Sequence, residues 1–237
     1  MNIVFDDMIK LVRARSCGLK AQDSQRKPSN SSRHYRQWGF TIYRTYYGVG
    51  SDKSWDMLLD ALRRQTRLAF GHYDDEEDVS QDNVQRLKEL FYIGAREDPS
   101  LLDGLDVRGI RQFCKQEKPD DDRVMANRLH HFVLLADESV LKDVSEREFV
   151  VKAVSLKWSS GHLGWGWMRI PTSYLLDLWL LLMLNRHRTE GVLFFKGPEG
   201  DLEDYVWPGD LALDYTGCCS EVRQFRHYHG QSPDRTN

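Results

Sequence analysis

The chain has 237 residues, of which 41% are hydrophobic, so it is long and apolar enough to fold around a core as one or two domains. A formal net charge of -3 with 29% charged residues excludes a highly charged disordered chain and argues against a nucleic-acid binder with an overall basic surface. The charge is uneven, because residues 13–37 hold seven Lys or Arg residues and one acid, which leaves the rest of the chain acidic.

Three features predict a cytoplasmic protein with no transmembrane segment. The four cysteines form no CxxC pair, which is typical of free thiols in a reducing compartment. Asp6 and Asp7 stand where a secretory signal needs basic and then apolar residues. The most apolar stretch, residues 174–184, contains Asp177 and is shorter than the roughly 20 residues that span a bilayer.

The composition divides the chain into three parts. Residues 1–37 are predicted to be a basic flexible leader, in which the apolar spacing of residues 1–12 is compatible with one short helix. Residues 38–207 are predicted to form a single α+β domain. Residues 208–237 have no sustained hydrophobic period, so we expect an irregular C-terminal tail.

The first half of the domain reads as one strand followed by three helices. Residues 38–47 are rich in aromatic and β-branched side chains and end at Gly48, which predicts a strand. A helix capped by Ser51 or Ser54 should follow it. Its apolar stripe is Trp55, Leu58, Leu59 and Leu62. Two further helices are expected, over residues 84–91 with Ser80 as cap and over residues 107–114 with Asp106 as cap.

The second half changes to an alternating period. Residues 129–135 and 149–158 read as strands joined by a short helix over residues 139–144. Residues 168–170 look extended and precede an apolar helix over residues 174–184, and residues 192–195 read as a fourth strand candidate. These elements predict an α+β fold with a mostly antiparallel sheet of about four strands packed with helices, ferredoxin-like or related.

Motifs for catalysis and cofactors are missing from the sequence. GxSxG, GxxxxGK[ST] and GxGxxG do not occur, so neither a hydrolase triad nor a phosphate cradle is indicated. His227 and His229 would share one face of a strand, but two ligands do not make a zinc centre. Cys114 lies on the apolar side of its helix, as a buried structural thiol would. We therefore expect no metal and no cofactor.

The candidate site residues are cations, imidazoles and rings next to glycine-rich loops. Aromatic rings near a loop can line a concave site for a flat ligand, although core and strand-edge packing is the favoured explanation for them. The candidates for catalysis are His130, His131 and Arg44, and those for ligand binding are Tyr43, Trp158, Trp165, Trp167 and Arg169. Because side chains alternate along a strand, only one of the two adjacent histidines can face a pocket.

Three separated segments carry a family resemblance. WGFTIYRTYY over residues 38–47, FVLLADESVL over residues 132–141 and GWMRI over residues 166–170 occur in an order that resembles a large family of filamentous-fungal proteins. The resemblance covers residues 38–195 and implies an architecture and a fungal origin, but no catalytic residues. Some proteins of this kind look like accessory products of secondary-metabolite gene clusters.

Two functions are compatible with this sequence. The first is an accessory protein that binds a protein partner or a small apolar molecule in fungal secondary metabolism, because no catalytic constellation is visible. The alternative is a cofactor-independent enzyme, a cyclase or isomerase, that acts on a polyketide- or terpenoid-like intermediate with His130 or His131 as general acid or base. The acidic body argues against nucleic acid as the partner.

Overall fold

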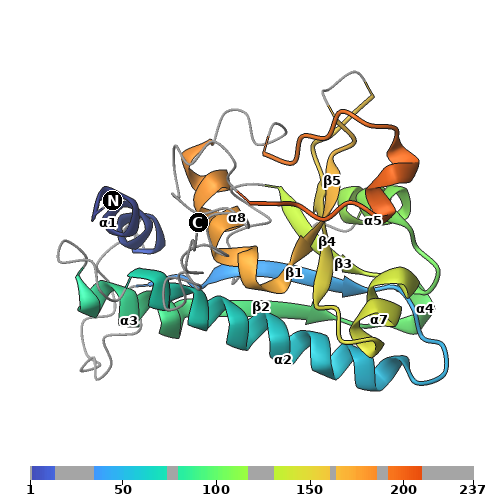
Figure 1. Ribbon diagram of the computed structural model, residues 1–237, viewed down its shortest axis with the longest axis horizontal. Helices are drawn as coiled ribbons and strands as arrows, with labels where there is room; N and C mark the ends of the chain where they lie inside the picture. The colour runs from blue at the N-terminus through green and yellow to red at the C-terminus, as the bar shows by residue number, and fades with distance from the viewer. Residues whose placement is uncertain are drawn as a thin grey trace, which may run out of the picture.

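A mixed five-stranded sheet lies at the centre of the molecule (Figure 1). The computed structural model describes residues 2–13, 35–73, 80–116, 131–160, 164–185 and 192–209. The strand order is β2-β1-β3-β4-β5. The strands are β1 (Trp38–Arg44), β2 (Phe91–Arg96), β3 (Phe132–Ala136), β4 (Val150–Ser155) and β5 (Trp167–Pro171). β1 pairs in parallel with both β2 and β3, whereas β3–β4 and β4–β5 are antiparallel.

The α+β class is confirmed, but the predicted sheet needs correction. It has five strands, and two of its four pairings are parallel, so it is not mostly antiparallel. β2 begins at the last residue of the helix predicted over residues 84–91, because a short apolar run has no period that separates helix from strand. Residues 168–170 do belong to a strand, whereas residues 192–195 form a turn and an irregular segment.

The helices cover the sheet and mostly begin where the sequence indicates. The Ser80 side chain accepts a hydrogen bond from Asn83 N, and Asp106 Oδ1 accepts one from Gly109 N at 2.7 Å. The predicted serine cap of α2 is wrong, because Gly50, with φ of 80°, occupies that position. The helices are α1 (Asn2–Val12), α2 (Ser51–Ala69), α3 (Gln81–Leu90), α4 (Pro99–Leu102), α5 (Val107–Gln116), α7 (Glu138–Ser145) and α8 (Leu175–Leu184). Short 3-10 segments are η2 (Phe70–Tyr73), η3 (Thr172–Tyr174) and η5 (Glu199–Glu203).

The main core lies between one face of the sheet and helices α2 and α8. Trp179 of α8 packs with ring centroids 5.5 Å from Trp38 and 5.8 Å from Phe40, both on β1. Every residue of α8 from Leu175 to Met183 is buried, as expected for a helix that is apolar on all sides except at Asp177. No helix among the described residues is long and apolar enough to cross a membrane.

Helix α1 belongs to this core, although the sequence placed residues 1–37 outside the domain. Phe5, Met8 and Val12 are buried in the same apolar cluster as the sheet residues. The Phe5 ring lies 5.7 Å from the ring of Phe70. The apolar face of the short helix is thus packed and not free. Residues 14–34 of the predicted leader and residues 210–237 of the predicted tail lie outside the described residues.

The opposite face of the sheet, here called the α5 face, carries the charged residues. Directly paired residues project to the same side of a sheet. The pairings Tyr43↔Leu135, Leu135↔Lys152 and Lys152↔Arg169 therefore place these four side chains on one face. α5 covers part of this face, because the Phe113 and Tyr43 rings meet edge to face at 6.0 Å.

Candidate functional site

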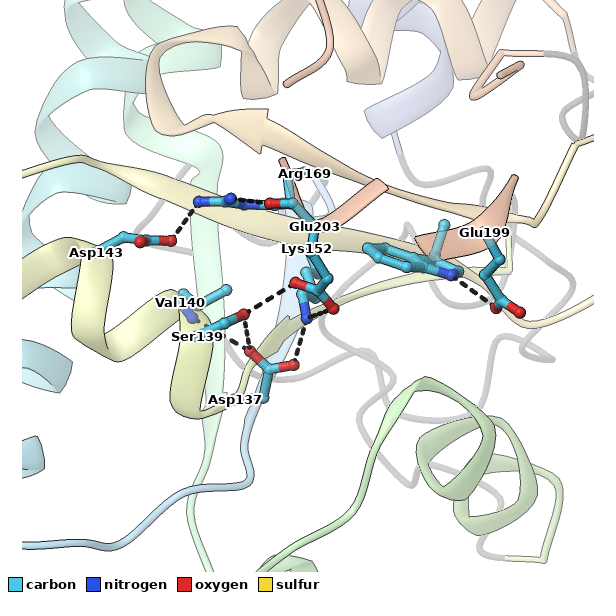
Figure 2. A network of polar contacts seen from close by, with 9 residues as sticks. Asp137, Ser139, Val140, Asp143, Lys152, Arg169, Glu199 and Glu203 are labelled. Carbon is cyan, nitrogen blue, oxygen red and sulfur yellow. Dashed lines mark hydrogen bonds and ion pairs between the residues drawn. The ribbon is translucent and has the colours of Figure 1, made fainter. Parts of the chain in front are cut away.

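Lys152 lies nearly buried on the α5 face between two carboxylates (Figure 2). Its Nζ donates to Asp137 Oδ2 and to Glu203 Oε1, both at 2.6 Å, and lies 5.1 Å from the ring centroid of Trp167. Asp137 also caps α7 by accepting from Val140 N. Lys152 therefore ties α7 and η5 to strand β4 of the sheet.

Arg169 makes a second connection between the same elements. Its guanidinium pairs with the Asp143 carboxylate of α7 and donates to the backbone oxygen of Glu203 (Figure 2). Burial raises the pKa of Asp143, and this effect outweighs the opposite influence of Arg169. Both cations are thus built into the fold, and their carboxylate partners come from segments remote in sequence.

A cleft of about 540 Å³ opens beside this network, at the carboxyl ends of β1 and β3; we call it the β1–β3 cleft. The chain runs from β1 to β2 on one side and then crosses to β3 on the other, so the cleft lies at a topological switch point, where ligands bind in open α/β sheets. Its charged lining residues are acidic Asp103, Asp106, Asp137, Glu138 and Glu203 and basic Lys142 and Lys152.

A second cleft, of about 610 Å³, has the opposite charge; we call it the α5 cleft. It is formed by α5 and by the segment that follows β4, at the other end of the β3–β4 pair. The described residues that line it include no carboxylate. They are Arg108, Arg111, Gln112, Lys115, Trp158 and Ser160.

Arg111 fixes the geometry of the α5 cleft. Its Nε donates to Ser155 O at 3.0 Å, its Nη2 donates to Trp165 O at 2.9 Å, and its Cζ lies 4.7 Å from the ring centroid of Trp158. Burial lowers the pKa of Arg111 to about 10, so the guanidinium stays charged at neutral pH. The cation and the ring therefore form one preorganised surface.

The predicted catalytic candidates are spread over the molecule. Arg44 donates from Nε to Tyr46 O at 3.0 Å and from Nη2 to Ser51 Oγ at 2.8 Å, and it pairs with Asp52, so it holds the loop between β1 and α2. His131 directly precedes β3, and its backbone oxygen accepts from Leu156 N. It is not among the described residues that line either cleft. His130 lies outside the described residues.

The predicted ligand-binding residues also have separate partners. Trp158 lines the α5 cleft, whereas Trp165 Nε1 donates to Gly197 O at 2.9 Å and Trp167 Nε1 donates to Glu199. Tyr43 packs on Phe113, and Arg169 belongs to the Lys152 network described above. Among these five candidates, only Trp158 lines one of the two described clefts.

Sequence reasoning missed Lys152 and Arg111, although both left a signal. Lys152 shares one face of its strand with Val150 and Val154. A cation on such an apolar face needs a buried partner. Arg111 lies four residues after Val107 on the apolar stripe of its helix. A cation inside an apolar period indicated a buried ionic contact, but the partner itself cannot be read from a local pattern.

Comparisons with protein-family models, with curated proteins and with solved structures find no match to this chain. Among the residues that the structure describes, no group of three or more His, Cys, Asp or Glu side chains could hold a metal ion.

Proposed function

We propose that this protein binds a flat, anionic small molecule in the α5 cleft. The observation that carries the proposal is the lining of this cleft, in which the Trp158 ring stands beside Arg108, Arg111 and Lys115 with no carboxylate among the described residues. The sign of this lining is opposite to that of the whole chain, which has a net charge of -3. The partly exposed Trp158 ring, which carries the Arg111 guanidinium on one face, and the three cations together favour a ligand that is both aromatic and negatively charged.

The cations of the cleft have different roles. Arg111 is held by two backbone oxygens and positions Trp158, so it supplies a fixed charge. The side chain of Arg108 is 80% exposed, and its contact with Glu199 at 3.4 Å is a surface ion pair of little strength. Arg108 can therefore turn from Glu199 to an incoming carboxylate, sulfonate or phenolate at low cost.

The resemblance to filamentous-fungal proteins narrows the ligand class. Many polyketide-like products are planar acids or phenols, which have the shape and the charge that the α5 cleft would select. As part of the proposal, the protein is an accessory binding protein of fungal secondary metabolism. The cofactor-independent cyclase or isomerase stays a prediction, because it needs a general acid or base at an aromatic pocket, and His131 is not in the described lining of either cleft.

Titration calorimetry with two probes of similar ring structure tests the proposal. Anilinonaphthalene sulfonate carries a negative charge, and N-phenylnaphthylamine has the same rings without it. We expect the sulfonate to bind wild-type protein more tightly than the neutral probe. R108Q and K115Q should each weaken only the sulfonate, about two- to fivefold for a loss of ~0.5–1 kcal/mol, and W158L should weaken both probes.

The matched control is R64Q, which removes an exposed cation of α2 that pairs with Asp60 and lies outside the cleft lining. It should leave both affinities unchanged. Equal binding of the charged and neutral probes, or equal losses in R64Q and K115Q, would refute a specific anionic site. Tighter binding of single-stranded oligonucleotides than of the sulfonate would also overturn the proposal in favour of a nucleic-acid partner.

A further inference from the structure

A third cavity, of about 300 Å³, lies between the start of α2 and one side of α7; we call it the α2–α7 pocket. The two helices pack against each other (Figure 1). Glu138, Leu141, Lys142 and Ser145 of α7 line the pocket, and their spacing of three or four residues places them on one side of that helix. The pocket adjoins the β1–β3 cleft, because Glu138 and Lys142 line both.

The loop between β1 and α2 holds the start of α2 in a fixed position. Ser51 N and Oγ both donate to Gly48 O, at 3.1 and 2.6 Å, and Arg44 Nη2 donates to Ser51 Oγ at 2.8 Å. The helix then begins without a side-chain cap. The amides of Asp52 and Lys53 have no hydrogen-bond partner among the described residues, as is usual in the first turn of a helix. This end of α2 therefore favours an anionic group.

Ser54 supplies an unused hydroxyl beside this helix end. The residue is only 5% exposed and lines the pocket, three residues after the start of α2. Its hydroxyl makes no hydrogen bond with a described residue, although a serine inside a helix can donate to the carbonyl four residues earlier. Its oxygen is not one of the unpartnered side-chain atoms that are sealed from solvent, so a molecule in the pocket can reach it. A nearly buried hydroxyl in this state indicates a missing partner.

The pocket also contains one exposed acid and one exposed base that are not paired. Glu138 and Lys142 are four residues apart on α7, which is the spacing that favours an ion pair. They make no ion pair with each other or with any other residue that the structure describes. A purely anionic ligand would be repelled by Glu138, and a purely cationic one by Lys142 and by the start of α2. A small molecule that carries both charges fits this lining.

We propose that the α2–α7 pocket binds an apolar α-amino acid. The ligand carboxylate accepts hydrogen bonds from Ser54 Oγ and from the free amides at the start of α2, and Lys142 balances its charge. The ligand ammonium group donates to Glu138, and the ligand side chain covers Val49, which lines the pocket and is 107% exposed. A volume of about 300 Å³ suits a molecule of this size. The pocket shares no lining residue with the α5 cleft, so this proposal is independent of the proposed function.

An NMR titration of the full-length, ¹⁵N-labelled protein with L-leucine tests this site. Two analogues each lack one charge: 4-methylpentanoate has no ammonium group, and 3-methylbutylamine has no carboxylate. We expect leucine to shift the amide signals of residues 50–54 and to bind about threefold or more tightly than either analogue. S54A should weaken leucine and 4-methylpentanoate about two- to fivefold and leave the amine unchanged. E138Q should weaken leucine and the amine by a similar factor, about two- to fivefold, and should not weaken the acid.

The control is D60N, which removes an exposed acid of α2 that does not line the pocket. It should not change leucine affinity. The thermal midpoint of S54A without ligand should not fall, because alanine favours a helix and the lost hydroxyl had no partner. The proposal is overturned if leucine does not shift residues 50–54, if S54A binds leucine as tightly as wild type, or if D60N weakens binding as much as E138Q does. Tighter binding of inorganic phosphate than of leucine would also overturn it, in favour of a simple anion site.

Discussion

Lys152 of β4 and Glu203 of η5 form an ion pair of 2.6 Å although 51 residues separate them in sequence. The lysine side chain is 3% exposed, whereas the glutamate side chain is 48% exposed. One buried cation thereby holds a surface segment against the sheet. The same cation contacts Asp137, the cap of α7, so a single side chain links three parts of the chain.

Replacing this lysine should destabilise the protein. K152M keeps the length of the side chain but leaves Asp137 and Glu203 without their cation, so we expect a loss of about 1–3 kcal/mol in the free energy of unfolding. The loss would be larger if the ion pair were completely buried, but water can solvate the exposed side of Glu203 in the variant. Urea denaturation measures the loss. K142M, at an exposed lysine of α7, is the control, and an equal effect of the two variants would contradict the assigned role.

Arg111 should matter to stability apart from any ligand. R111M removes both donors to Ser155 O and Trp165 O, and these oxygens would lose their partners in a partly buried site. We expect a loss of about 2–3 kcal/mol in urea denaturation without ligand. R108M changes the exposed neighbour and should cost less than ~0.5 kcal/mol. A loss in R108M as large as that in R111M would show that the two arginines do not differ as described.

Helix α1 should contribute to the core. M8A removes a side chain with no exposed surface, so we expect a loss of about 2–5 kcal/mol and a lower thermal midpoint. K10A, in the same helix, alters a side chain that is 72% exposed and should leave the midpoint unchanged. If M8A and the wild type have the same thermal midpoint, residues 1–12 do not contribute to the core.

Gly39 should not tolerate a side chain. It has φ of +131°, and a Cβ atom would come within 2.0 Å of Tyr92 O on the neighbouring strand β2. G39A should therefore lose ~3 kcal/mol or more, measured by chemical denaturation. Gly200 of η5 has no atom within 4 Å of an added Cβ, so G200A serves as the control and should retain wild-type stability.

His131 should make the fold less stable in mild acid. Burial, and secondarily Lys157, lower the pKa of His131 below its ordinary value of 6.5. The unfolded chain then binds more protons than the folded one as pH falls through about 6.5, so the free energy of unfolding decreases in that direction. H131N, which suits the positive φ of 54°, should show a smaller decrease between about pH 7.5 and 5.5 in urea denaturation. An unchanged pH dependence would mean that other groups cause it.

Local patterns were sufficient to predict the elements that bury one regular face. The stripe of Trp55, Leu58 and Leu62 and the apolar run of α8 predict helices, and both are buried. The strand at Trp38 and the caps at Ser80 and Asp106 were also predictable, because each depends on residues within one or two turns. The short strand β2 was missed because a run of this length has no distinguishing period.

The sequence by itself determined which side chains of the regular strands and helices face inward. Apolar residues recur there with a period of two or of 3.6, and this period can be read from neighbouring residues. Only the tertiary structure decided the strand order, the parallel pairing of β1 with β3 and the separation of an acidic from a basic cleft. These depend on which distant segments meet: Lys152 reaches Glu203, and Arg111 reaches Ser155. A charged residue within an apolar pattern indicates that a buried partner is needed. Which residue becomes that partner depends on how the whole chain packs.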